Sequence, residues 1–451
     1  MIPNLSQGEF VASLHRHLSP TAPIQSQENL YGRETQVRAI EQALYAPGRT
    51  IFIHGDRGVG KTSLAHTVAF AHQSARGEPV ILACTPETTF SSIIRDVVNA
   101  LQSEDHRASA LTQTAKVGVG VASYEIEHTR HRNATAPVSA VDLNTAVAAL
   151  LRIAEARKNE QMVVVIDEFD RITSQAERTH FADFIKQVAD QRIGIKFVFC
   201  GVAESLEKLL GAHESCYRYI ASIQLPRLSW DARWEIIDGA AKALGVVVDD
   251  HPRFRIAAIS DGFPHYVHLV CEKLFWEMFD DPDGCTKPTI EHYRAAVAQS
   301  VLGIEQHLQK AYDHATMKNS DGYEEVLWAV ADHSDLVRSS DSIYQSYENI
   351  AITLDIDQPM DRTTFSTRMQ ALKSPGCGQI LASNRRGWYQ FRESIVRGYV
   401  RLRAEEKGLE LALDYAAGTA TSTTTWRPRG ARRSRRGMTA QDLERLRNPQ
   451  Q

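Results

Sequence analysis

The sequence predicts an α/β protein in which a parallel sheet is flanked by helices, followed by a helical lid and a C-terminal winged-helix domain. Four short apolar runs are predicted strands: residues 50–54, 80–84, 161–166 and 195–200. Helical patterns lie between these runs, and strands that alternate with helices form a parallel sheet covered on both faces. From Ser229 onward the pattern is helical, which indicates a second domain.

The composition excludes several classes of protein. A chain of 451 residues with 43% hydrophobic content has room for about three domains and is not disordered throughout. Because 51 Lys and Arg oppose 55 Asp and Glu, the net charge is −4, which excludes a wholly basic nucleic-acid binder. The six cysteines form no CxxC pair, and no apolar stretch is long enough to cross a bilayer. We therefore expect a cytoplasmic protein without a membrane partner.

The domain boundaries follow changes in this pattern. We predict five segments: an N-terminal extension (1–28), the α/β domain (29–228), the lid (229–317), the winged helix (318–408) and a tail (409–451). The tail is rich in Thr and Arg and has little to bury, so we expect it to be disordered. Alternating apolar residues at 116–128 predict a β-hairpin that either extends the sheet edge or contacts a partner.

Three helices closed by a two-stranded wing predict the winged helix. The predicted helices are 323–333, 342–354 and 362–372, and the predicted strands are 378–381 and 388–391. The third helix would face DNA with Arg362, Arg368 and Lys373, and the wing tip would add Arg385 and Arg386. Acidic residues elsewhere in the same domain leave protein binding as the alternative.

One motif defines the chemistry of the α/β domain. Residues 55–62, GDRGVGKT, match GxxxxGK(S/T) at every fixed position, between a predicted strand and a predicted helix. The glycines turn backbone N–H groups around phosphate oxygens, Lys61 would reach the β and γ phosphates, and Thr62 would bind Mg²⁺. This motif predicts a P-loop NTPase that binds ATP with Mg²⁺. The residues expected to contact the nucleotide are Gly55, Asp56, Arg57, Gly58, Val59, Gly60, Lys61, Thr62 and Ser63.

A second motif predicts hydrolysis. Residues 163–168, VVVIDE, form an apolar strand that ends in two acids, and the carboxyl end of such a strand faces the nucleotide in a doubly wound sheet. Asp167 would hold Mg²⁺ through its water shell, while Glu168 would orient and polarise the attacking water. The predicted catalytic residues of this chain's own site are therefore Lys61 and Glu168.

With these elements in this order, residues 29–407 resemble the AAA+ ATPases of the origin-recognition initiator type and the related STAND-like ATPases. The resemblance implies that Tyr31, in Leu30-Tyr-Gly-Arg-Glu34, lies in the segment whose backbone contacts adenine. It also implies that Arg218 is an arginine finger for a neighbouring subunit's nucleotide, and hence a homo-oligomer. The alternative is that Arg218 pairs with a local acid.

Two positions depart from the initiator pattern. Residues 199–202, FCGV, lack the polar residue that senses the γ phosphate in initiators, so that role is unassigned. In the lid, Gly262-Phe-Pro-His265 contains a GxP that resembles STAND proteins. His265 either contacts phosphate or packs against its surroundings.

These observations predict an AAA+ ATPase that acts as a nucleotide-controlled oligomeric switch and engages double-stranded DNA through the winged helix and the Arg-rich tail. The alternative function is a STAND-like signalling or phage-defence NTPase whose C-terminal domain binds a protein effector. A small-molecule kinase built on the same loop lacks an evident acceptor site.

Overall fold

The structure is a computed structural model that describes most of the chain. It covers residues 2, 5–20, 22–24, 26–74, 77–114, 142–158, 160–212, 217–317 and 322–411. The hairpin predicted at 116–128 and the tail from residue 412 onward lie outside the described residues. Every helix in the described ranges is too short or too polar to span a lipid bilayer.

Five parallel strands form the central sheet, in the order β2-β3-β4-β1-β5. The strands are β1 (Thr50–His54), β2 (Val80–Ala83), β3 (Met162–Asp167), β4 (Ile195–Gly201) and β5 (Ile220–Gln224). The parallel sheet is confirmed, and the three inner strands β3, β4 and β1 are buried almost throughout. The sequence prediction missed β5 because this edge strand alternates buried residues with exposed or half-buried ones such as Ser222 and Gln224.

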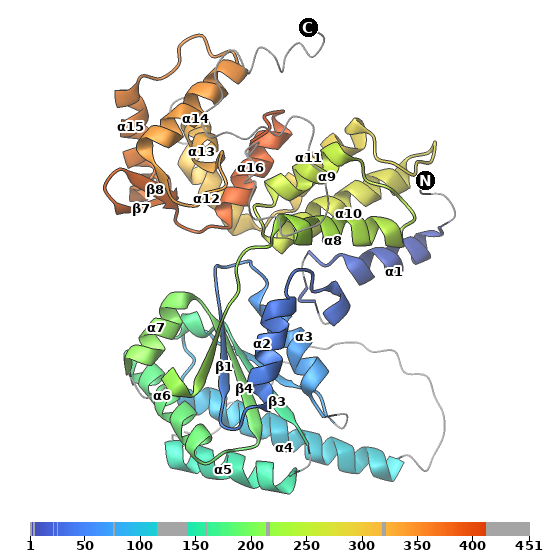
Figure 1. Ribbon diagram of the computed structural model, residues 1–451, viewed down its shortest axis with the longest axis vertical. Coiled ribbons are helices and arrows are strands. Elements are labelled where there is room, and N and C mark those ends of the chain that lie inside the picture. Colours follow the sequence, from blue (N-terminus) through green and yellow to red (C-terminus); the bar gives the residue numbers. More distant parts are fainter. Residues whose placement is uncertain are drawn as a thin grey trace.

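Helices cover both faces of the sheet, as predicted (Figure 1). They are α2 (Glu34–Tyr45), α3 (Lys61–His72), α4 (Phe90–Thr114), α5 (Leu143–Ala156), α6 (Gln175–Asp190) and α7 (Ala203–Ala212). Alternate residues of β1 enter different cores: Ile51 and Ile53 pack in the core that contains α2 and α3, whereas Phe52 packs in the core that contains α4 to α6.

A helical lid follows the sheet and carries the N-terminal extension on its surface. Its helices are α8 (Trp230–Ala243), α9 (Asp250–Ile259), α10 (Pro264–Asp280), α11 (Ile290–Gly303) and α12 (Gln306–Thr316). Helix α1 (Gln7–His17) packs against α8, and Phe10 stacks on Phe279 with ring centroids 4.3 Å apart. No helix was predicted in this extension. The sequence features that could have indicated one are the capping box of Ser6 and Glu9 and the apolar pair Phe10 and Leu14, which is buried.

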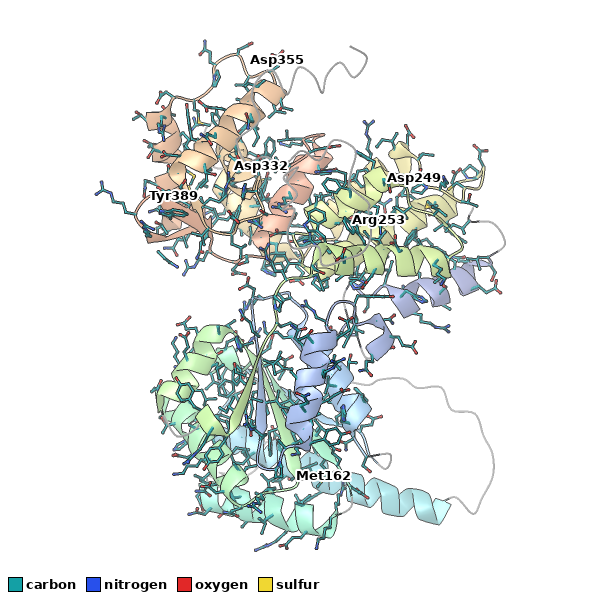
Figure 2. All side chains as sticks on the ribbon, in the orientation of Figure 1. Met162, Asp249, Arg253, Asp332, Asp355 and Tyr389 are labelled. Atoms are coloured by element: carbon teal, nitrogen blue, oxygen red, sulfur yellow. The ribbon has the colours of Figure 1, made fainter. Side chains whose placement is uncertain are left out.

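The third region has the winged-helix arrangement that the sequence predicts. Its elements are α13 (Tyr323–Ala331), β6 (Arg338–Ser339), α14 (Ser340–Thr353), α15 (Arg362–Ala371), β7 (Leu381–Arg385), β8 (Trp388–Phe391) and α16 (Val396–Glu406), with the sheet order β6-β8-β7. The predicted strand at 378–381 is wrong, because residues 375–377 form a 3-10 turn and Gly378 is left-handed with φ 69°. Tyr389 (Figure 2) joins α15 to the wing, since Gln370 Nε2 donates to its hydroxyl at 2.6 Å.

Helix α16 lies between the lid and the winged helix and packs against both (Figure 1). A methyl group placed at Gly398 would lie 2.3 Å from Cε2 of Tyr266 on α10, so only glycine permits this approach. The hydroxyl of Tyr266 donates to the carbonyl of Ile395 at 2.8 Å. The start of α16 is therefore held directly against the lid.

Candidate functional site

The predicted phosphate-binding loop connects the end of β1 to the start of α3. Gly58 and Gly60 have φ of 81° and 96°, a left-handed conformation that other residues rarely adopt. A methyl group at Gly55 would lie 2.3 Å from the carbonyl oxygen of Leu225. The three glycines of the motif are therefore required by backbone conformation or by close approach.

Lys61 is held inside this loop. Its ammonium donates to the carbonyl oxygens of Gly55 and Asp56 at 3.1 and 2.8 Å. Burial lowers the pKa of Lys61, and Asp170 is the first of the nearby acids that oppose the shift. The phosphates of a nucleotide would offer this cation stronger, charged acceptors than the two carbonyls.

The hydroxyl of Thr62 donates to Oδ2 of Asp167 at 2.6 Å, although the two residues are far apart in the sequence. The backbone N–H of Glu168 donates to the other carboxylate oxygen at 2.7 Å, so both oxygens of Asp167 are oriented. A hydroxyl and a buried carboxylate are the hard oxygen donors that Mg²⁺ prefers, and this pair fits such an ion. When bound, Mg²⁺ would neutralise charge on the phosphates.

Glu168 is engaged by a neighbouring cation. Its carboxylate forms an ion pair with Nε of Arg171 at 2.9 Å, and its side chain is 45% exposed. The residue itself is left-handed, with φ 53°, and begins a short 3-10 turn. To orient a water at a γ phosphate, the carboxylate has to leave Arg171.

The lid and the winged helix meet at the phosphate-binding loop. A methyl group placed at Gly58 would lie 2.5 Å from Cδ1 of Ile395 and 3.4 Å from Cδ1 of Phe263. One at Gly60 would lie 3.8 Å from Cγ of Pro264. The GxP motif of the lid and the start of α16 therefore cover the loop together. Only the contribution of the lid was predicted from the sequence.

A cavity of about 520 Å³ opens beside the loop, a volume in the range of small-molecule sites. Its walls are the loop, the carboxyl ends of β4 and β5, and the winged helix. The lining includes Asp56, Arg57, Gln224, Arg227, Arg392 and Glu393. Sequence reasoning missed Arg227 and Arg392, because no local motif marks them and only the folding of the chain brings them to the loop.

Three predicted nucleotide contacts are engaged by protein groups. Nδ1 of His265 is 2.9 Å from the carbonyl oxygen of Pro20, and the hydroxyl of Ser63 accepts from the N–H of Ile24 at 3.2 Å. The hydroxyl of Tyr31 lies against α8, 2.5 Å from a methyl group placed at Gly239. His265 thus packs against the N-terminal extension here, and nucleotide contact by these three residues stays a prediction.

Arg218 does not join this chain's own loop. It directly precedes β5 and is exposed, so it lies at the amino end of the sheet, whereas the loop follows the carboxyl end of β1. Its guanidinium lies 5.1 Å from the ring centroid of Tyr219. Within the described ranges it forms no ion pair with an acid.

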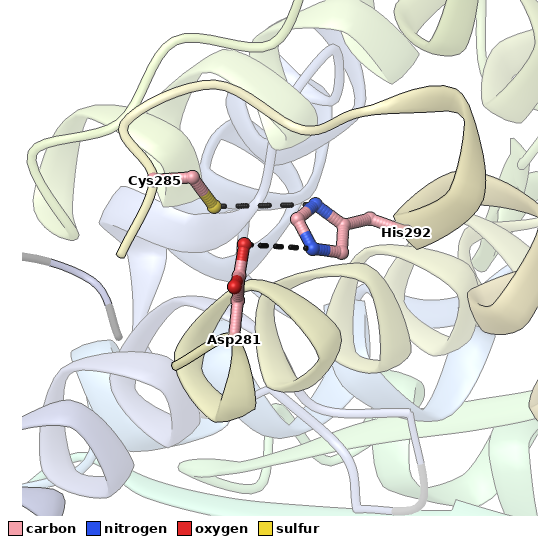
Figure 3. A group of neighbouring side chains, drawn as sticks. All are labelled: Asp281, Cys285 and His292. Atoms are coloured by element: carbon pink, nitrogen blue, oxygen red, sulfur yellow. Dashed lines mark hydrogen bonds and ion pairs between the residues drawn. The ribbon is translucent and has the colours of Figure 1, made fainter. Parts of the chain in front are cut away.

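Asp281, Cys285 and His292 form a separate cluster with metal-ligand chemistry between α10 and α11 (Figure 3). Nδ1 of His292 accepts from the backbone N–H of Thr289 at 3.1 Å, and Nε2 lies 3.2 Å from the carboxylate of Asp281. Because Nδ1 of His292 accepts a hydrogen bond, the ring proton lies on Nε2, and Nε2 donates to Asp281. Burial raises the pKa of Cys285, which keeps the thiol protonated. These bonds complete the capping box of α11 and leave no ring nitrogen free for an ion.

Comparison with known proteins agrees with the geometry of the loop. Residues 29–197, which include Lys61, Asp167 and Glu168, match the family described as the AAA ATPase domain. No curated protein matches the chain.

Solved structures are similar to the chain at low sequence identity. The Walker-type ATPase of Pyrococcus abyssi is 15% identical with a TM-score of 0.49, over 84% of this chain and 98% of that one. Cdc6p from Pyrobaculum aerophilum is 13% identical with a TM-score of 0.41, over 89% of this chain and 99% of that one. The Aeropyrum pernix ORC1 protein in complex with DNA is 16% identical with a TM-score of 0.40, over 84% and 93%.

Replacing Lys61 and Glu168 should separate nucleotide binding from turnover. We expect Lys61→Ala to abolish ATP binding, because the loop loses its charged phosphate ligand. Glu168→Gln should retain ATP but lower turnover by about 100-fold or more, because the amide is no base. Calorimetric titration and phosphate release measure the two effects. Glu204→Gln, at an exposed acid of α7, is the matched control. Normal hydrolysis by Glu168→Gln would show that the base is another residue.

Proposed function

We propose that this chain, whose residues 29–197 match the AAA ATPase domain, is an ATPase that acts as a nucleotide-controlled switch. In this proposal, ATP with Mg²⁺ binds at the loop, and binding and hydrolysis change the position of the winged helix. The observation that carries the proposal is the contact of Ile395 and Phe263 with Gly58. A ligand that reshapes the loop has to displace or reorder these side chains, so site occupancy and winged-helix position are linked.

A buried carboxylate connects the three regions that meet at the loop. Asp261, in the lid, accepts from Nη1 of Arg227 at 2.6 Å and from Nε of Arg397 at 2.7 Å. Nη1 of Arg401 lies 3.2 Å from the same carboxylate. Arg227 lies in the connection that follows β5, while Arg397 and Arg401 belong to α16. One side chain of the lid therefore holds both the α/β domain and the winged helix.

The charge balance of this network favours one closed arrangement. Burial alone would raise the pKa of Asp261, but Arg397, Arg401 and Arg227 outweigh it and hold the pKa well below its ordinary value. Three guanidinium groups surround one carboxylate, and carbonyl oxygens at helix C-termini partly offset the remaining positive charge. Arg401 donates to the carbonyls of Ala258, near the end of α9, and Ala331, at the end of α13, at 2.8 and 2.9 Å. A partly broken buried network is costly. We therefore expect this network to be either fully formed, with the winged helix docked, or fully released.

Engagement of DNA is the finer part of the proposal. The outward face of α15 carries neutral polar side chains suited to base edges: Thr363, Ser366, Thr367 and Gln370. Arg385 and Arg386 at the wing tip are exposed and suit phosphate contacts. Arg368 and Lys373 are half-buried, with their charges near the rings of Tyr323 and Tyr389, and their contact with DNA stays a prediction.

Binding of a protein effector is the second candidate for the winged helix. A hollow of about 260 Å³ at the wing has an apolar lining that includes Val337 and Trp388, and Val337 is 46% exposed. An exposed apolar hollow is more typical of protein contacts than of DNA contacts.

Removing the charge of Asp261 tests the switch. We expect Asp261→Asn to leave three guanidinium groups without their carboxylate and to release the winged helix, because breaking a buried pair costs about 3–5 kcal/mol. Hydrogen exchange in residues 322–411 should respond to ATP in the wild type and should be fast with or without ATP in the variant. Asp238→Asn, which removes the carboxylate that pairs with Arg253, is the control. A wild-type pattern indifferent to ATP would refute the switch.

Mixing two inactive variants tests a site shared between subunits. Lys61→Ala lacks a working loop and Arg218→Ala lacks the proposed finger, so each alone should hydrolyse ATP poorly. In a random equimolar oligomer, about a quarter of the interfaces combine an intact loop with an intact finger, and activity should recover accordingly. Phosphate release across mixing ratios measures this recovery. Its absence at every ratio would argue against Arg218 as a finger.

Salt dependence separates DNA from protein as the winged-helix partner. We expect duplex binding to weaken with salt, and Arg385→Ala with Arg386→Ala to lower the slope of log affinity against log salt by about 2. Fluorescence anisotropy over several salt concentrations gives the slope. Arg38→Ala, at an exposed position of α2, should leave it unchanged. A wild-type protein without salt-dependent binding would favour the protein effector.

A further inference from the structure

Arg33 immediately precedes α2 and lies behind the phosphate-binding loop. Its side chain is buried, with 4% of its surface exposed. Nη2 donates to the carbonyl oxygen of Val59 at 2.9 Å, and Nη1 donates to the carbonyl oxygen of Pro226 at 2.7 Å. One guanidinium thus joins the middle of the loop to the chain that follows β5.

The charge of Arg33 has no direct counter-ion in the described part of the chain. Some other buried arginines pair with an acid, as Arg255 does with Glu405 and Arg397 with Asp261, whereas Arg233, like Arg33, donates to backbone carbonyls. Burial lowers the pKa of Arg33 to about 10, which still leaves it charged at neutral pH, and Glu34 only partly opposes this shift. A buried cation that meets only backbone carbonyls is costly, and an anion bound nearby would offset that cost.

The contact with Val59 also sets the direction of the loop backbone. Val59 lies between Gly58 and Gly60, the two left-handed glycines. While Arg33 holds this carbonyl, its oxygen is kept from turning toward a bound phosphate, which it would repel. The backbone of Leu225 supports the same loop, since its N–H donates to the carbonyl of His54 at 2.7 Å.

We propose that Arg33 is a positioning residue for the phosphate-binding loop: it orients Val59 and supplies buried positive charge that favours nucleotide phosphates without touching them. This inference rests on the nucleotide site proposed above. The electrostatic part grows with the number of ligand charges, so loss of Arg33 should weaken ATP more than ADP, and ADP more than AMP. A loss of global stability alone would not produce this order, and Arg33→Lys, which keeps the charge, separates the electrostatic part from the orientation of Val59.

The test compares three variants by calorimetric titration at fixed salt without Mg²⁺, so that ATP, ADP and AMP carry about four, three and two negative charges. Arg33→Met keeps length and removes charge, and we expect ATP binding about tenfold weaker, with smaller losses for ADP and AMP. Arg33→Lys keeps the charge but lacks the fork that reaches two carbonyls, so it should recover part of the loss. Arg338→Met is the matched control, because this buried arginine of the winged helix also donates to backbone carbonyls, those of Ala329 and Ser342.

The outcomes are distinguishable. Arg338→Met should lower the melting temperature and leave nucleotide affinities as in the wild type. Wild-type affinity for ATP in Arg33→Met, or an equal loss for all three nucleotides, would overturn the inference. If Arg33→Met does not fold, Arg33→Gln, which also removes the charge, decides by the same order of losses. Equal ATP binding by the wild type and Lys61→Ala would instead refute the proposed nucleotide site.

Discussion

The carboxylate of Asp261 is buried among guanidinium groups from the α/β domain and from α16, and the arrangement of the three regions depends on it. A buried charge is tolerated only with partners, and here each partner comes from a different part of the chain than the lid. Ile395 and Phe263, which lie near these paired residues in the sequence, contact the phosphate-binding loop. The position of the winged helix and the shape of the site therefore depend on the same side-chain contacts.

Several cations lie around the loop, beside the acids Asp56, Asp167 and Asp170. Lys61 lies within it, Arg33 lies behind it, and Arg57, Arg227 and Arg392 line the adjoining cavity. Much of this charge meets carbonyl oxygens or shared carboxylates, which are weaker partners than phosphate. In the proposed switch, phosphate binding would change the charge balance of this network and would thereby link site chemistry to domain position.

Local signals predicted the sheet, the loop and the acids Asp167 and Glu168, because a strand followed by a glycine turn and a helix is determined by neighbouring residues. Prediction failed where the signal was weak or distant. Strand β5 alternates at the sheet edge, α1 is a single short amphipathic helix, and β6 has two residues. The wing strand was misplaced because the 3-10 turn before Gly378 depends on backbone conformation rather than on hydrophobic pattern.

The sequence by itself determined that this chain has a phosphate-binding loop, two acids after a buried strand, a lid and a winged helix, because motif spacing and hydrophobic period are local properties. Only the tertiary structure decided which residues surround that loop. Asp261, Ile395 and Arg397 carry no motif, and their roles arise from contacts across domain boundaries, while the contact of Arg33 with Val59 is not encoded in the segment 30–34 that contains it. Such contacts depend on how buried charges pair and how closely side chains approach glycines in the folded chain. The spacing of residues in the sequence does not encode these contacts.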